Sequence, residues 1–393
     1  MAITRRHFFF GSLALPVFAG KAPPPRPNIL LFLVDYLPAW MLGCYGNKEV
    51  RTPNIDQLCQ SGTHFLNHLV STPEPRASRA TFLTGAIPAQ AASPDTGLDK
   101  ILGGAGYEAH TGDASEAAGF LEKRAGDKPF LFIAGSSKLH APYGGVPQKY
   151  HDLYRDVKFE GYAPDPVASN AAAGKEMLTD IIGNVRKYAA ALSELDDYVG
   201  AAVGQVRKRG LVDNTLIILT STCGSLLGRH GLWGAGDGSN PPNMFEEAIA
   251  TPMIWSWAGH VPAIARQVEL IASYDFAPTL CDVVGVAPSN GWRGISYLLM
   301  ATGKPLPKKT RWRATVCGAI QNTEMARVER YKWITRNDGK GPNELYDLTA
   351  DPHEHTNQAD NESFISTKNT LAAEIVKWKS GPAAQTRDKK KHK

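Results

Sequence analysis

Three runs dominated by apolar residues stand out along the chain, at 28–34, 130–134 and 215–221. A run that is apolar on both faces is typical of a central strand in a parallel sheet, because helices cover such a strand on both sides. Before the third run, apolar residues recur at three- and four-residue steps, which predicts a long helix from about Lys175 to Gly210. The residues of its apolar face are Tyr188, Ala191, Leu192, Leu195, Val199, Ala202 and Val206. The pattern predicts an α/β fold whose mixed, mostly parallel sheet is flanked by helices.

A smaller region is predicted after the proline- and lysine-rich linker at 303–309. Strand-like segments at 310–316 and 331–336 and a helix near 367–379 are typical of a small α/β subdomain. We therefore expect four parts along the chain: residues 1–22 as a signal segment, 26–302 as the α/β domain, 310–380 as the C-terminal subdomain and 381–393 as a basic tail.

The composition and charge of the chain are typical of a globular protein with a modest positive charge. With 43% hydrophobic and 21% charged residues, a chain of 393 residues can bury a sizeable core. Part of the net charge of +5 lies in residues 387–393, which is typical of a solvated tail, so we expect no nucleic-acid partner. The five cysteines show no metal-binding spacing, and their odd number leaves at least one thiol unpaired. They are Cys44, Cys59, Cys223, Cys281 and Cys317, and the sequence leaves their pairing and the oligomeric state open.

The first 22 residues have the order of charge and apolarity expected of an export signal. Arg5 and Arg6 precede an apolar run, 8–19, that is too short to span a bilayer, and Val17 and Ala19 suit a cleavage site. The segment resembles a twin-arginine signal, which implies the twin-arginine export machinery as a partner and a periplasmic or secreted protein. The alternative is an ordinary N-terminus with a chance pair of arginines.

Candidate chemistry begins at the ends of the predicted strands. Asp35 follows the first apolar run, and ligands bind at the carboxyl ends of strands in sheets of this kind. Farther on, a loop broken by Pro73 and Pro75 leads into a helix that we expect to open near Ser78 as its N-cap. The amide donors of that helix end, with the guanidinium of Arg79, are predicted to face an anion.

Residues 75–85 resemble the signature of the sulfatases of the alkaline-phosphatase superfamily, Cys-x-Pro-Ser-Arg followed by Ala-Ser/Thr-x-Leu-Thr-Gly. Seven residues match it: Ser78, Arg79, Ala80, Thr81, Leu83, Thr84 and Gly85. Pro75 stands where the family has the Cys or Ser that is oxidised to formylglycine, and Ala77 stands where it has Pro. Proline has neither thiol nor hydroxyl, so the aldehyde-hydrate nucleophile of the family cannot form at position 75.

The resemblance extends over most of residues 26–360 and implies the alkaline-phosphatase-like sulfatase fold. It also implies a divalent-metal site, Ca²⁺ or another ion, at which Asp35 is the only matching ligand. Tyr36, Thr222 and Cys223 occupy the other ligand positions, so we expect no tight Ca²⁺ site. A zinc site at Cys223, Asp35 and a histidine has no supporting spacing.

The sulfate-binding residues of the family are matched only in part. His140 lies in Leu139-His140-Ala141-Pro142-Tyr143, which is similar to the element whose His faces the sulfate, and His230 lies in a matching His-Gly-Leu-Trp-Gly stretch. Ala235 replaces the Lys that follows this stretch. The family's other Lys and His, expected after Gly85, have no counterpart that can be assigned, although His110 lies nearby.

We therefore expect an exported sulfatase-family protein that is catalytically degenerate and uses no cofactor. Ser78, Arg79, His140 and His230 are expected to form a weak residual site for a sulfate- or phosphate-like anion or a sulfated ligand. Two alternatives remain open. One is an active sulfate- or phosphate-ester hydrolase with a rewired site, and the other is a binding or assembly module at the cell surface.

Export can be tested directly. Replacing Arg5 and Arg6 together by lysine preserves the charge and removes the paired guanidinium groups that the twin-arginine signal requires. We expect the variant to stay in the cytoplasm, as measured by cell fractionation and immunoblotting. An unchanged periplasmic yield would contradict the prediction.

Overall fold

The computed structural model describes residues 26–87, 97–162, 164–289, 291–308 and 310–380. The predicted signal segment and basic tail lie outside these residues. A seven-stranded sheet forms the centre of the molecule, in the order β4-β5-β1-β6-β7-β2-β8. Its strands are β1 (Asn28–Val34), β2 (Thr63–Phe65), β4 (Glu108–Asp113), β5 (Phe130–Gly135), β6 (Thr215–Ser221), β7 (Met253–Ser256) and β8 (Ala265–Gln267).

The four consecutive strands β4, β5, β1 and β6 run parallel, whereas β7 is antiparallel to both of its neighbours. The predicted fold class, a mixed and mostly parallel sheet flanked by helices, is therefore confirmed. The strands expected at 28–34 and 215–221 are β1 and β6. A separate two-stranded sheet pairs β3 (His68–Leu69) with β9 (Ile271–Ala272).

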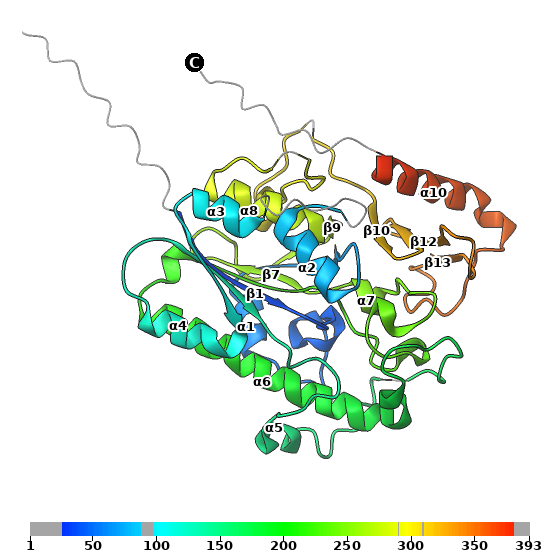
Figure 1. The fold of residues 1–393 in the computed structure, drawn as a ribbon, viewed down its shortest axis with the longest axis horizontal. Helices are drawn as coiled ribbons and strands as arrows, with labels where there is room; N and C mark the ends of the chain where they lie inside the picture. The colour runs from blue at the N-terminus through cyan, green and yellow to red at the C-terminus, as the bar shows by residue number, and fades with distance from the viewer. Residues whose placement is uncertain (1–25, 88–96, 163, 290, 309, 381–393) are drawn as a thin grey trace, which may run out of the picture.

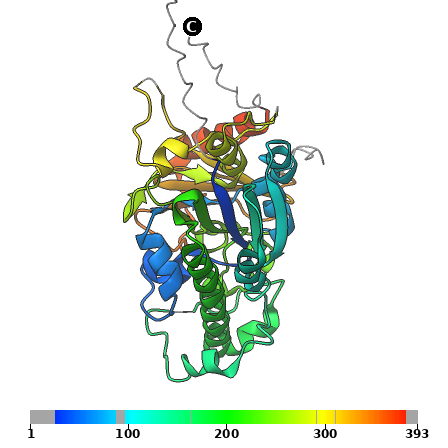
Figure 2. The same cartoon turned by 90° about the vertical axis from the view of Figure 1, so that its left-hand side faces the viewer.

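Helices cover both faces of the sheet (Figures 1 and 2). One face packs against α1 (Pro53–Gln60), α4 (Ala117–Lys123) and the long α6 (Ile181–Lys208). The other packs against α2 (Pro75–Thr84), α3 (Leu98–Gly104) and α8 (Phe276–Val284). Strand β1 separates the two cores, because its alternate side chains point to opposite faces of the sheet. The shorter helices are α5 (Gln148–Asp152), α7 (Glu246–Ile249) and α9 (Leu298–Ala301).

The predicted long helix begins with a different geometry from the one expected. Residues Lys175–Asp180 form a 3₁₀ segment, and α6 starts at Ile181, where the Asp180 carboxylate accepts a hydrogen bond from the Gly183 amide at 3.0 Å. None of the helices in the described part of the chain has the length and apolarity needed to cross a membrane.

The C-terminal subdomain is a four-stranded antiparallel sheet with one helix packed against it (Figure 1). It contains β10 (Val316–Ile320), β11 (Thr323–Arg327), β12 (Tyr331–Arg336), β13 (Glu344–Asp347) and α10 (Ile365–Ser380). The strand expected at 310–316 is wrong, because β10 begins only at Val316. The side chains before it are engaged by the main domain: Trp312 donates to the Leu270 carbonyl, and Arg313 pairs with the buried Asp275.

A buried lysine joins the subdomain to the α/β domain. Lys332 on β12 is fully buried, and its Nζ lies 3.2 Å from Glu246 Oε1 and 2.5 Å from Glu354 Oε1. It also donates to the Met244 carbonyl at 2.7 Å. A charge so far from water needs partners of this kind, and here they come from both parts of the fold. The loop around Glu354 is thereby held against α7.

Candidate functional site

Helix α2 places the signature residues, and its N-terminus differs from the expected one. The helix begins at Pro75, and Glu74 is the N-cap residue, whose carboxylate accepts hydrogen bonds from the amides of Arg76 at 3.1 Å and Ala77 at 2.7 Å. Ser78 is therefore not the N-cap; it lies within the helix, and its own amide donates to the Glu74 carbonyl. The prediction failed because an acidic side chain before a proline caps the helix one turn earlier. The amides of Arg76 and Ala77, which were expected to face an anion, therefore already donate to the Glu74 carboxylate.

The other end of α2 explains why the signature closes on glycine. Gly85 has φ +62°, and a Cβ at this position would lie 2.7 Å from the ring of Trp292. Only glycine combines that backbone conformation with so close a contact at low cost. The buried Trp292 in turn fixes the helix against the second core. Ser78 faces inward from this helix, and its Oγ has no hydrogen-bond partner among the described residues.

Three of the predicted site residues meet at the carboxyl ends of the central strands. Asp35 follows β1, and its Oδ1 accepts from Arg79 Nη2 at 3.0 Å and from Thr222 Oγ1 at 2.6 Å. Its Oδ2 lies 3.2 Å from His140 Nε2, which comes from the loop after β5. Arg79 also donates to the Leu33 carbonyl at 3.0 Å. Both oxygens of the carboxylate are thus held by groups of the protein itself.

The charge of Asp35 is stabilised despite partial burial. Burial alone would raise the pKa of this carboxyl group, but the hydrogen bonds from His140 and Thr222 and the charges of Arg79 and His140 lower it below its ordinary value of 3.8. Asp35 is therefore ionised at neutral pH. We call Asp35, Arg79, His140 and Thr222 the Asp35 cluster.

Uncharged side chains occupy the predicted metal-ligand and sulfate-binding positions other than those of Asp35, Arg79, His140 and His230. Cys223, Ala235 and Ala248 are fully buried and pack together, with Tyr36 against them. Burial raises the pKa of the Cys223 thiol and of the Tyr36 phenol far above their usual values, so both groups are neutral. Tyr36 also places its ring edge-on to that of His140, with 4.9 Å between the ring centroids.

These residues do not fit a Ca²⁺ ion. Such an ion takes six to eight oxygen ligands, several of them carboxylates. Within the described residues, Asp35 belongs to no group of three His, Cys, Asp or Glu side chains close enough to share an ion. Its carboxylate is also already bound by a guanidinium group, which a cation would have to displace.

A small cavity of about 230 Å³ opens beside the Asp35 cluster. His140 and Tyr36 line it, together with Asp237, Glu176 and Ser225. Asp237 Oδ1 is buried without a hydrogen-bond partner among the described residues. Asp237 and Glu176 were not predicted, because each lies in a short 3₁₀ segment where no periodicity or motif spacing distinguishes a residue that lines a cavity from a solvated one.

His230 contacts a different set of residues from the one predicted. Its backbone amide donates to Asp165 Oδ2 at 2.6 Å, and its ring Nε2 lies 3.2 Å from Glu247 Oε2. The ring stacks on Phe245 with 3.7 Å between centroids. His110, the other histidine considered from the sequence, lies on β4 and packs against Phe120. Neither histidine contributes to the hydrogen bonds of the Asp35 cluster.

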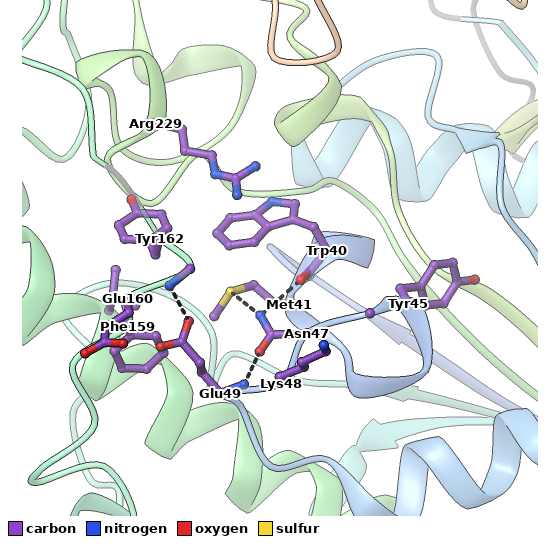
Figure 3. A pocket seen from close by; sticks show the side chains of 13 residues that line it. Trp40, Met41, Tyr45, Asn47, Lys48, Glu49, Phe159, Glu160, Tyr162 and Arg229 are labelled. Carbon is purple, nitrogen blue, oxygen red and sulfur yellow. Dashed lines mark hydrogen bonds between the residues drawn. The ribbon is translucent and has the colours of Figure 1, made fainter. Parts of the chain in front are cut away.

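A larger cavity of about 540 Å³ has an aromatic and cationic wall (Figure 3). The guanidinium of Arg229 lies 4.0 Å from the centroid of the Trp40 ring, and Trp40 stacks on Tyr162 at 5.9 Å. Lys48 and Glu49 add charges of both signs to the lining. Such a wall suits a ligand with a flat apolar face and polar edges.

Comparisons with known proteins agree with the fold and the signature. A family model described as Sulfatase matches residues 27–116 and 114–286, and one described as N-sulphoglucosamine sulphohydrolase, C-terminal, matches 240–381. An ulvan-active sulfatase from Formosa agariphila is 22% identical, covering 90% of this chain and 81% of its own length.

Two solved structures share the fold. One, a protein in complex with its substrate D-glucosamine-2-N,6-O-disulfate, has a TM-score of 0.75 and 19% identity, over 92% of this chain and 100% of its own. The other, a phosphonate monoester hydrolase of Agrobacterium radiobacter, has a TM-score of 0.74 and 19% identity, over 90% and 95% of the two chains.

The pairing of Arg79 with Asp35 can be tested by stability. In Arg79→Gln, the carboxylate loses its cationic partner while it stays partly buried, so we expect a loss of about 1–2 kcal/mol in the free energy of unfolding. Urea denaturation at pH 7 measures it. Arg76→Gln, an exposed arginine on the same helix, is the matched control and should change stability by less than about 0.5 kcal/mol. Equal effects of the two substitutions would mean that the pair does not hold the site.

Proposed function

The chain belongs to the sulfatase family, and on that premise we propose that it is a member that has lost sulfate-ester hydrolysis. The proposal includes export, for which Arg5 and Arg6 before a short apolar run are the support. It leaves at most a weak site for a sulfate- or phosphate-like anion near Arg79 and His140, because Arg79 Nη2 and His140 Nε2 are already engaged with Asp35.

One observation carries the proposal: the positions that hold reactive and charged groups in the family are filled here by neutral side chains that pack on one another. Cys223 stands at a metal-ligand position, Ala235 at that of a sulfate-binding lysine and Tyr36 at that of a second aspartate. All three belong to a single apolar cluster with Ala248. Restoring one of them would still leave the others packed in the site.

The chemistry that remains is far from that of the family. Pro75 is the first residue of α2 and offers no nucleophile. A covalent nucleophile and a metal ion each lower the barrier of a hydrolysis by several kcal/mol, and their joint loss costs many powers of ten in rate. Asp35, the one carboxylate that matches a family metal ligand, is bound by Arg79, His140 and Thr222 and cannot act as a free base.

A rewired hydrolase is the second candidate, and the small cavity is the reason to consider it. His140 and Asp237 both line that cavity, and Asp237 Oδ1 has no hydrogen-bond partner in the described part of the chain. The two side chains could transfer protons to and from an ester. The structural likeness to a phosphonate monoester hydrolase concerns the fold alone at 19% identity. In this candidate, activity depends on His140 and Asp237.

The third candidate, a binding module at the cell surface, draws on the larger cavity. Its wall of Arg229, Trp40 and Tyr162 needs no catalytic group to bind a ligand. Under both this candidate and the leading proposal, the protein hydrolyses no ester. They differ in whether a ligand binds in the larger cavity.

Turnover decides between the leading proposal and the rewired hydrolase. We expect purified protein at 10 μM or a similarly high concentration to release no nitrophenol above background from nitrophenyl sulfate, phosphate or phenylphosphonate esters. Pro75→Cys, produced beside a formylglycine-generating enzyme, should be equally inactive, because Ala235 and Cys223 remain. Hydrolysis by the natural chain that is abolished in His140→Gln and in Asp237→Asn would overturn the proposal and establish the rewired site.

A further inference from the structure

A second group of polar side chains lies around His230, and its recorded partners are different from those of Asp35. Asp165, His230 and His355 each offer one ligand atom, and these three atoms lie within 4.8 Å of one another. His355 Nε2 is 3.4 Å from Asp165 Oδ2, and the rings of His230 and His355 are 5.6 Å apart between centroids. Within the described residues, this is the one group of its kind.

The backbone holds Asp165 beside His230. The Asp165 amide donates to the Gly228 carbonyl at 3.3 Å, and the Ala168 amide donates to that of Gly231 at 3.1 Å. Gly231 has φ +64°, and a Cβ there would lie only 1.9 Å from the Pro166 carbonyl oxygen. The two loops therefore meet at a contact that requires glycine, and Asp165 has little freedom to move away.

The ring of His230 is also fixed in orientation. It stacks on Phe245 at an interplanar angle of 3°. Its Nε2 lies 3.2 Å from Oε2 of the buried Glu247, whose Oε1 is 3.1 Å from the guanidinium of Arg229. A histidine that donates Nε2–H to a carboxylate presents Nδ1 as a lone pair, which is the common arrangement of histidines that bind metals.

From this geometry we propose that Asp165, His230 and His355 bind a divalent transition-metal ion, with Zn²⁺ as the best match, in a site separate from the Asp35 cluster. Two imidazoles and a carboxylate suit zinc, whereas Ca²⁺ prefers oxygen ligands alone. Ligands at about 2.0–2.1 Å from a tetrahedral zinc ion lie about 3.3 Å from one another. The pair Asp165 and His355 already has that spacing, and His355, which is 55% exposed, has room to approach His230.

The ion would join two parts of the fold. Asp165 and His230 belong to loops of the α/β domain, whereas His355 follows β13 of the C-terminal subdomain and is next to Glu354, which pairs with Lys332. A bound ion therefore adds a second link beside the buried ion pair, and its effect is to stabilise the folded chain. The proposed ion has a structural role and takes no part in a reaction with a substrate.

The test is calorimetric titration of ZnCl₂ into the full chain, produced without a polyhistidine tag and stripped with chelator. We expect one ion per chain and a rise in melting temperature with Zn²⁺ that Ca²⁺ does not cause. His355→Ala and Asp165→Asn should weaken binding by about a hundredfold or more, since even partners of metal ligands are worth 10–100-fold. His110→Ala, which removes another exposed histidine, should bind as the natural chain does.

Three outcomes would overturn the proposal. They are the absence of stoichiometric binding, binding that survives both His355→Ala and Asp165→Asn, and binding lost equally in His110→Ala. Because His355 is exposed, the melting temperature of His355→Ala without metal should equal that of the natural chain, which separates loss of the site from loss of the fold. The result does not depend on whether the chain hydrolyses an ester.

Discussion

The partly buried carboxylate of Asp35 determines which side chains must surround it at the ends of the central strands. Its side chain is only 15% exposed, and an ionised group so placed needs compensation close at hand. Arg79 from α2, His140 from the loop after β5 and Thr222 from the end of β6 supply it. The arrangement depends on the register of β5, β1 and β6, which brings the ends of these strands together. Protein donors thus hold the carboxylate at which the family resemblance implies a cation.

The replacements around Asp35 are mutually consistent. A site that lost its metal but kept several carboxylates would carry repelling charges in a place shielded from water. Here Tyr36, Cys223 and Ala235 are neutral and pack together. Asp35 itself is paired with the opposite charge of Arg79 at 3.0 Å. This arrangement supports the proposal that hydrolysis has been lost through changes across the whole site.

Periodicity and motif spacing predicted the architecture and part of the site. Apolar runs and strand ends placed β1, β6 and Asp35, and the signature placed Arg79, because these features depend on residues close together in the chain. The cap of α2 was missed, since whether Glu74 or Ser78 accepts the first amides depends on where the helix starts. The partners of His230 were missed for another reason. Asp165 and His355 reach it through loops whose paths are set by tertiary contacts such as that of Gly231 with Pro166.

The sign of one stability change tests the central claim most directly. In a site built for a metal, removing a ligand carboxylate relieves repulsion in the metal-free protein and stabilises it. In the site described here, Asp35→Asn leaves Arg79 without its partner. We predict that Asp35→Asn lowers the free energy of unfolding by at least about 1 kcal/mol in urea denaturation with chelator present. An Asp35→Asn protein as stable as the natural chain, or more stable, would contradict the account.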